Sequence, residues 1–148
     1  MPFRLVIPEP IYAAMVAQAL VEQPNECVGL LAGVVEKRSD KTTATVKIGR
    51  VIERYPLVNE AHSPKEFFNL GKDLFEASRD MRNRRLDTLA VYHSHPSAPP
   101  QPSKKDIARN YQGPNVISLI ISLLTTPPTV RAWWLRKGGF REAECEVR

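Results

Sequence analysis

The chain lacks the features that mark secreted, disulfide-bonded or membrane-spanning proteins. Its 148 residues include two cysteines, Cys27 and Cys145, too few for a disulfide framework, which predicts a reducing, cytoplasmic setting. It has no run of about 18 apolar residues of the kind that crosses a membrane as a helix, so no membrane partner is expected. The opening Met-Pro-Phe-Arg places proline and charge where a secretory signal needs an apolar stretch.

Positive charge is in slight excess but is not concentrated. The formal net charge is +5, and the hydrophobic share of 43% and charged share of 25% are ordinary for a globular domain with its own core. One basic cluster, residues 79–85, fits the solvated end of a helix, where cations suit the helix dipole. Basic and aromatic residues do not interleave, so we expect no nucleic-acid partner. Binding to a nucleic acid, if it occurred, would weaken steeply as the salt concentration rises.

Hydrophobic periodicity predicts one helix and a hairpin in the first third of the chain. Apolar residues recur at helical spacing over 11–23, between prolines that suit the start and the stop of a helix. The apolar run 28–35 and the alternating segment 42–54 predict two strands that form a hairpin, with its turn at 38–41.

A second helix is expected in the middle of the chain. Ser63-Pro64-Lys65-Glu66 is a capping-box pattern with proline at the first helical position, and it predicts a helix that reaches Arg84. The apolar residues expected to face inward are Phe67, Leu70, Leu74 and Met81.

The rest of the chain is predicted to be mostly β-strand. Strands are expected at 88–92, 116–124, 130–135 and 140–147, the last two forming a hairpin around two glycines. Prolines interrupt regular structure over 96–102, and Ser103 starts a short helix. The order α-β-β-α-β-α-β-β-β predicts an α/β fold: a single domain over residues 1–148 with a mixed β-sheet flanked by helices.

Two histidines, His93 and His95, and the later Asp106 form a pattern typical of a metal site. Histidines two residues apart on a strand point to one face, about 7 Å apart along the chain. Asp106 supplies a third ligand, and the prolines before it lower the entropy cost of bringing it back. Three protein ligands and one open position are typical of catalytic zinc. Two neutral imidazoles and one carboxylate leave such a site positively charged, which favours a zinc hydrolase.

Each of these residues also has a structural interpretation. Ser103-x-x-Asp106 is itself a capping box, with Ser103 as the N-cap residue. A lone His93 or His95 would more often be an exposed or hydrogen-bonded histidine than a metal ligand. The two interpretations are compatible, because a helix start at Ser103 would aim Asp106 and free N–H groups toward a metal.

Hydrolysis at a metal also needs a general base. Glu26 precedes the first predicted strand and fits this role, with an exposed loop carboxylate as the alternative. The neighbouring Cys27 is interpreted as a buried thiol at a strand start rather than a nucleophile. Cys145, in the last predicted strand, is likewise expected to be structural.

The motif His-Ser-His at 93–95, a seven-residue gap and then Ser-x-x-Asp at 103–106 resembles the signature of the JAMM/MPN (JAB-domain) zinc metalloproteases in residue type and spacing. Upstream, Glu26-x-x-Gly29-Leu30-Leu31 resembles the family's segment that carries the catalytic glutamate. This resemblance implies a cytidine-deaminase-like JAB/MPN fold over nearly the whole chain. It also implies roles for five residues: zinc ligands His93, His95 and Asp106, proton acceptor and donor Glu26, and Ser103 as hydrogen-bond partner of the water or the tetrahedral oxyanion.

The resemblance further implies an activity, hydrolysis of the isopeptide or peptide bond after the C-terminal tail of a ubiquitin-like protein. This compact chain is most similar to the small prokaryotic members, which act on ubiquitin-like sulfur-carrier proteins. The alternative is a non-catalytic MPN-type module that binds a ubiquitin-like partner. The carrier protein, the leaving group and the oligomeric state stay open.

Two further features have open interpretations. Residues 58–68 correspond to a region where family members contact the substrate, so His62 would either shape the tail channel or be an exposed loop histidine. Trp133 and Trp134 are adjacent on a predicted strand and face opposite ways. We therefore expect one of them in the core and the other in an exposed patch at a partner surface.

Overall fold

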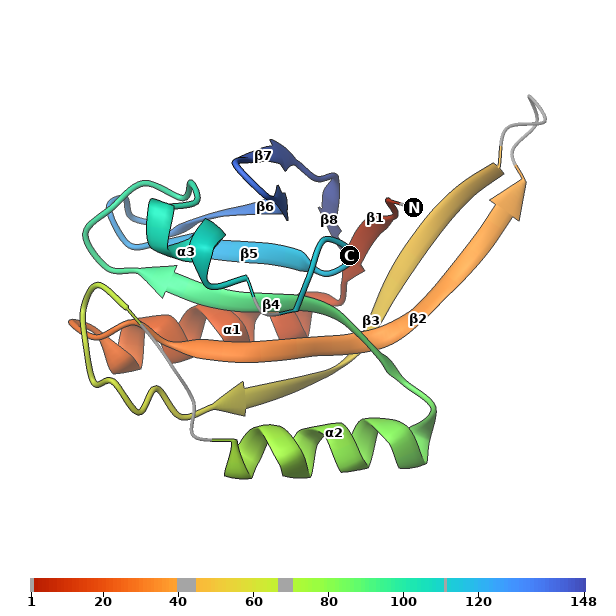
Figure 1. Cartoon of the computed structure of the whole chain (residues 1–148), viewed down its shortest axis with the longest axis horizontal. Helices are drawn as coiled ribbons and strands as arrows, with labels where there is room; N and C mark the ends of the chain where they lie inside the picture. The colour runs from red at the N-terminus through yellow and green to blue at the C-terminus, as the bar shows by residue number, and fades with distance from the viewer. Residues whose placement is uncertain (1, 40–44, 67–70, 111) are drawn as a thin grey trace.

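Eight strands and three helices follow one another in the described part of the chain. The structure is a computed structural model that describes residues 2–39, 45–66, 71–110 and 112–148. Figure 1 shows its elements, which in order are β1 (Arg4–Ile7), α1 (Glu9–Glu22), β2 (Val28–Ser39), β3 (Thr45–Leu57), α2 (Lys72–Arg84), β4 (Asp87–His95), α3 (Lys104–Ala108), β5 (Ile117–Ser122), β6 (Thr129–Arg136), β7 (Gly139–Glu142) and β8 (Cys145–Val147). Within the described ranges, no helix combines the length and apolar character needed to cross a bilayer.

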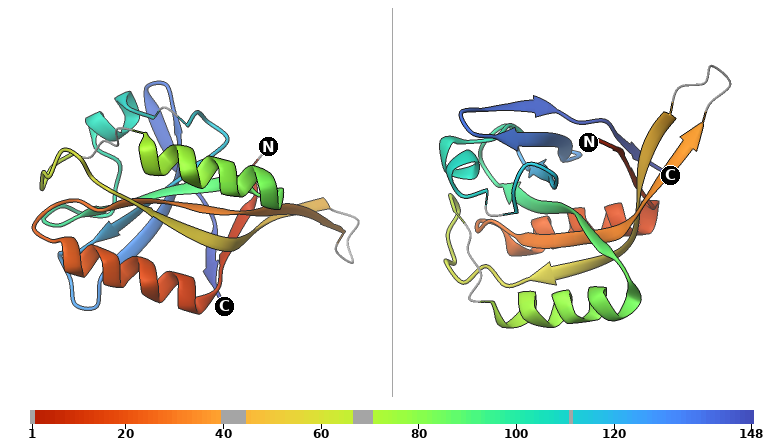
Figure 2. Two further views of the ribbon diagram at one scale, coloured as in Figure 1. Left: turned by 90° about the horizontal axis from the view of Figure 1, so that it is seen from below. Right: turned by 45° about the vertical axis from the view of Figure 1, so that its right-hand side comes forward.

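The strands form one mixed sheet in the order β7-β6-β5-β4-β2-β3-β1-β8. Strand β2 runs antiparallel to both neighbours, β3 and β4, whereas β5 pairs parallel with β4. Ala143 and Glu144 connect β7 and β8, the two edges of the sheet. Ala143 N–H donates to Ala132 O (2.8 Å) and Glu144 O accepts from Leu5 N–H (3.0 Å), so the sheet curls and its edges approach each other (Figure 2). The expected α/β architecture, a mixed sheet flanked by helices, is confirmed.

Helices α1 and α2 cover opposite faces of the sheet (Figure 2). Side chains of β2 alternate between these faces, so that Leu31 packs in the cluster that includes α1 and Leu30 packs in the cluster that includes α2. Tyr92 of β4 belongs to the α1-side cluster. The strand period therefore turns the next residue, His93, to the α2 side, where α3 also lies.

Helix α2 begins at Lys72, eight residues after Pro64, the predicted first helical residue, so the capping box expected at Ser63 is wrong. The Ser63 hydroxyl accepts from Lys65 N–H (3.2 Å) in a local turn. The Glu66 carboxylate reaches across to α3 instead of capping a helix. Of the residues expected to face inward, Met81 is buried, Leu74 is partly buried, and Phe67 and Leu70 lie outside the described residues.

Both ends of the chain differ from the prediction. The sequence pattern does not predict β1, because four residues are too short to show a period. The single strand expected over 140–147 is wrong, because β7 ends at Glu142 and β8 begins at Cys145 on the opposite edge of the sheet. Such long-range pairing leaves no local signal in the sequence.

The two tryptophans face opposite sides of β6, as expected, but neither forms an exposed patch. Trp134 packs edge-on against Phe3, with ring centroids 5.1 Å apart. Trp133 packs with Ile120 and donates its indole N–H to Pro100 O (2.8 Å). Both side chains are buried, because the proline-rich segment covers the second face of the strand.

Candidate metal centre

The site forms where the end of β4 lies beside the chain just before β2. Val28 pairs with His93 in the sheet register, and hydrogen bonds extend this pairing to Cys27 and Ser94. Ser94 N–H donates to Cys27 O (3.2 Å), and the Ser94 hydroxyl oxygen accepts from Cys27 N–H (2.8 Å). Because side chains alternate along a strand, this register turns Glu26 to the face that carries His93.

Three potential metal ligands converge at this point. His93 Nε2 lies 3.1 Å from His95 Nε2 and 3.2 Å from Asp106 Oδ1, and His95 Nε2 lies 3.2 Å from Asp106 Oδ2. Donors about 2.0–2.2 Å from one tetrahedral Zn²⁺ ion would lie roughly 3.3–3.5 Å apart. The observed separations are close to these dimensions, with each histidine nearest to a different oxygen of Asp106. Nitrogen and oxygen are donors that zinc accepts. The three residues could therefore hold a metal ion.

Backbone and side-chain hydrogen bonds orient two of these ligands. His95 Nδ1 lies 2.9 Å from Pro99 O, and since a carbonyl only accepts, Nδ1 carries the proton and Nε2 faces the cluster. Asp106 Oδ2 accepts from Ser103 N–H (2.8 Å), and the Ser103 hydroxyl oxygen accepts from Asp106 N–H (3.1 Å). The capping box expected at Ser103 is confirmed, and it holds Asp106 toward the histidines.

In the metal-free protein these groups stabilise one another electrostatically. Burial acts to raise the pKa of Asp106, but hydrogen bonds from His93 and His95 outweigh it and hold the pKa well below its usual range. Burial acts to lower the pKa of His95, but Asp106 and the Pro99 carbonyl raise it above its usual value. The carboxylate is therefore available as an anionic ligand at neutral pH.

Glu26 is buried beside this cluster, with 4% of its surface exposed. Its Oε1 atom has no hydrogen-bond partner among the described residues. Burial raises the pKa of Glu26 to about 8, with His95 lowering it and Asp106 raising it. Its backbone is held on both sides: Glu26 N–H donates to Ser63 O (2.8 Å), and Glu26 O accepts from Asn59 Nδ2 (2.9 Å). A buried carboxyl oxygen without a partner is unusual in a folded protein, where nearly all buried polar atoms are hydrogen-bonded.

Comparison with known proteins agrees with this geometry. A model of the prokaryotic homologs of the JAB domain matches residues 8–136. The chain belongs to this family.

Curated relatives of the JAB domain carry names that concern protein conjugates and a phage tail. This chain is 35% identical over 104 residues to a probable TtuB-protein conjugate cleaving protease of Thermus thermophilus. The match covers 70% of this chain and 61% of the relative. The chain is also 32% identical over 76 residues to a desampylase of Pyrococcus furiosus (51% and 54%) and 33% identical over 96 residues to tail tip assembly protein K of Escherichia phage N15 (65% and 32%). The aligned parts thus span between 32% and 61% of these relatives' lengths.

Solved structures share the fold. A protein from Desulfitobacterium hafniense superposes with a TM-score of 0.80 at 30% identity, covering 97% of this chain and 92% of that one. A JAB1/MPN domain protein from Archaeoglobus fulgidus superposes with a TM-score of 0.54 at 18% identity, covering 98% of both chains, which supports the fold alone.

The other singled-out residues lie outside the donor cluster. His62 is on the exposed surface of the β3–α2 loop, with a positive φ of 46°. Cys27 is buried, in keeping with a structural thiol, whereas Cys145 is exposed in β8 and does not fit the expected structural role.

Two residues that support the site do not stand out in the sequence. Ser94 joins the Glu26 segment to β4, and its only sequence signal is its place between the two histidines. Asn59 is buried and donates its side-chain amide to Glu26 O and to Glu66 O (3.0 Å). Its partners lie 33 and 7 residues away in the chain, so no local sequence pattern predicts that Asn59 supports the Glu26 segment.

Proposed function

We propose that this JAB domain is a zinc-dependent isopeptidase or peptidase that hydrolyses the bond after the C-terminal tail of a ubiquitin-like or sulfur-carrier protein. The observation that carries the proposal is the cluster of His93, His95 and Asp106 donors, with the Glu26 carboxyl and its unpartnered Oε1 atom buried beside it. The names of two relatives, a probable conjugate-cleaving protease and a desampylase, support the substrate class.

The residues divide the chemistry among them. A bound Zn²⁺ would act as a Lewis acid that activates the attacking water and polarises the scissile carbonyl. Glu26 would accept a proton from the attacking water and deliver it to the leaving amine. Ser103 accepts a hydrogen bond at its oxygen, so its own O–H proton can be donated to the developing oxyanion. The buried position of Glu26 and the histidines limits competing solvent near the reacting atoms.

The test is cleavage of a sulfur-carrier protein fused through its C-terminal Gly-Gly to a reporter protein. We expect zinc-loaded wild type to release the reporter, chelator to stop the reaction, and Glu26→Gln to lower kcat by at least about 100-fold while retaining zinc. Gel analysis of the products and elemental analysis of the variant measure both effects. Cleavage by Glu26→Gln at the wild-type rate would reject Glu26 as the base. Tight binding of the fusion without cleavage by wild type would favour the non-catalytic module instead.

A further inference from the structure

A cavity of about 460 Å³ opens on the α2 side of the sheet, with His93 and Asp106 in its wall. It lies between α2 and α3. Its volume is in the range of sites that enclose a ligand or a few side chains. The floor is apolar and is formed mainly by Val28, Leu30, Leu57, Leu74, Val91 and Leu135. An occupant of this cavity would therefore place apolar groups next to the candidate metal centre.

The mouth of the same cavity is positively charged. Three cations, Lys65, Lys105 and Arg109, line the cavity with two carboxylates, Glu66 and the candidate ligand Asp106, so positive charge is in excess. Glu66 Oε2 lies 3.2 Å from Lys105 Nζ and 3.3 Å from Arg109 Nη1. This contact connects the β3–α2 loop with α3 across the opening of the cavity.

The Glu66 contact is replaceable. The side chains of Lys105 and Arg109 are 57% and 45% exposed, and that of Glu66 is 36% exposed. Ion pairs at such exposure contribute little stability, so another carboxylate could exchange with Glu66 at small cost. Lys105, Arg109 and the candidate ligand Asp106 line the same cavity, so a group bound by the two cations shares that cavity with the reacting atoms.

We propose that Lys105 and Arg109 bind a carboxylate of the substrate, and that Glu66 occupies this place in the free protein. The inference rests on the proposed function, because the occupant is the substrate segment beside the scissile bond. The apolar floor and the positive mouth together select a segment with an apolar side chain and a carboxylate. Glu66 shows that a carboxylate fits between the two cations.

A carboxylate can reach this place from two sources. It is either an acidic side chain in the tail of the carrier protein or the free terminal carboxylate of a residue on the leaving side. Two pairs of fluorescein-labelled peptides separate these sources. The first pair is Ala-Glu-Leu-Gly-Gly-Ala-amide against Ala-Gln-Leu-Gly-Gly-Ala-amide. The second pair is Ala-Gln-Leu-Gly-Gly-Ala with a free carboxylate against the same amide.

The experiment measures the dissociation constants of these peptides by fluorescence anisotropy with zinc-loaded Glu26→Gln protein, which binds without turnover. We expect the charged member of one pair to bind roughly two- to fivefold more tightly, the range that an ion pair at this exposure supplies. Adding Lys105→Met and Arg109→Met should remove that preference. Adding Glu66→Gln should instead tighten the charged peptide more than the neutral one, because the competing carboxylate is gone.

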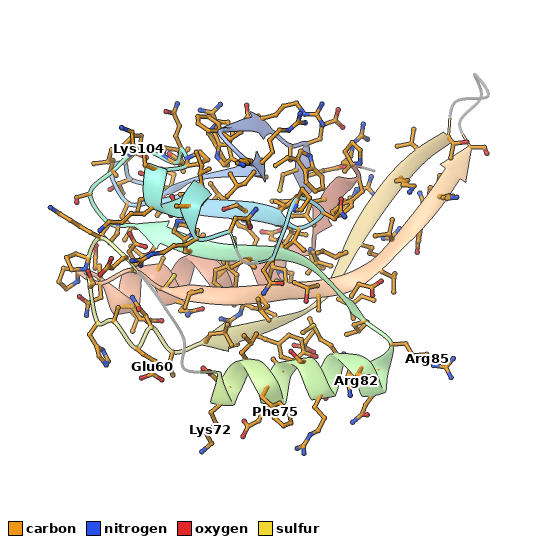
Figure 3. All side chains as sticks on the ribbon, in the orientation of Figure 1. Glu60, Lys72, Phe75, Arg82, Arg85 and Lys104 are labelled. Carbon is orange, nitrogen blue, oxygen red and sulfur yellow. The ribbon has the colours of Figure 1, made fainter. Side chains whose placement is uncertain are left out.

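A matched control removes one lysine and one arginine outside the cavity. Lys72→Met with Arg82→Met removes two cations whose side chains point away from the sheet on α2 (Figure 3), and it should leave the preference intact. Zinc content and thermal midpoint verify that each variant is folded. If the double variant at Lys105 and Arg109 does not fold, the single variant Arg109→Met carries the same prediction with a smaller loss.

Equal affinity for both members of both pairs would overturn the inference, as would a preference that survives the loss of both cations. Cleavage of the neutral amide peptide by wild type is scored separately. Cleavage without any charge preference rejects this inference alone. A charge preference without cleavage of any conjugate rejects the proposed function and leaves the carboxylate site standing.

Discussion

Glu26 is a buried carboxyl group whose Oε1 atom finds no hydrogen-bond partner among the described residues. Ionising such a group inside the fold costs free energy, because water no longer solvates the charge. In the metal-free protein this cost raises the pKa of Glu26 to about 8. Glu26 thus lowers the stability of the metal-free fold, as residues in active sites often do.

We expect Glu26→Gln to stabilise the metal-free protein increasingly as the pH rises. The raised pKa means that the contribution of the neutral carboxyl is fully present below its ordinary value of 4.5 and is lost as the pH rises through about 8. The variant should match wild type near pH 4 and exceed it by on the order of 3 kcal/mol at pH 7. Urea unfolding of both chelated proteins between pH 4 and 9 measures this difference. A difference that does not change with pH would contradict the raised pKa.

Among the elements, the paired ends of β2 and β4 determine the relative position of Glu26 and the histidines. The hydroxyl of Ser94 is the side-chain component of this pairing, because it accepts from the buried Cys27 N–H. We expect Ser94→Ala to leave that N–H without its acceptor, at a cost of about 1–3 kcal/mol. Loss of this contact should also let the neighbouring Glu26 shift, which should lower kcat by about tenfold with little change in KM.

Thermal unfolding and steady-state kinetics of Ser94→Ala test this expectation, with zinc content as a check on the ligands. Thr88→Val, near the other end of β4, removes a hydroxyl whose contact is a 3.6 Å approach to the Met81 sulfur. This control should retain wild-type kcat. Unchanged kcat in Ser94→Ala would show that the pairing of backbone groups alone positions the base.

Gly29 of β2 permits the close approach of Tyr92 of β4. A Cβ atom at position 29 would lie 2.1 Å from the Tyr92 hydroxyl oxygen and 2.2 Å from its Cζ atom, and Tyr92 is fully buried. We expect Gly29→Ala to lower the free energy of unfolding by about 3 kcal/mol through overpacking. Gly139→Ala is the control, because its Cβ would meet nothing within 4 Å. Equal losses in chemical denaturation would contradict this account of the β2–β4 contact.

The sequence predicts an element well where its signal is local. The cap at Ser103 and the two histidines on β4 are such cases, since the residue types and their spacing lie within 14 positions. The start of α2 is a case where the local pattern misleads. Ser63 forms a turn and Glu66 contacts α3, but the same residue types at the same spacing also fit a helix cap. Asn59 is a supporting residue whose partners come from distant segments, so only the structure reveals it.

At the scale of the whole molecule, the sheet brings residues from both halves of the chain to one end. The pairing of β1 with β8 and the burial of Trp133 under the proline-rich segment both depend on contacts between distant parts of the chain. Neither could be predicted from the periodicity of a single segment. The mixed sheet with its flanking helices could, because each main element carries its own hydrophobic pattern.

The hydrophobic clusters on the two faces of the sheet do not depend on the candidate metal ligands. We therefore expect the chelated protein to remain folded, with a cooperative thermal transition. Zinc at about 100 times its dissociation constant should add roughly 2.7 kcal/mol and raise the midpoint by roughly 5–10 °C. Differential scanning calorimetry with and without zinc measures the shift. An unfolded chelated protein would contradict the independence of the core from the metal.

The proposed function requires that His93, His95 and Asp106 hold a catalytic zinc ion beside Glu26. The most direct test is the zinc content per chain, by elemental analysis after zinc is supplied and the loose excess is removed, for wild type, His95→Ala and Glu26→Gln. We expect one tightly held zinc in wild type and in Glu26→Gln, and its loss in His95→Ala. A folded wild type without zinc, or a His95→Ala variant that keeps it, would contradict the claim.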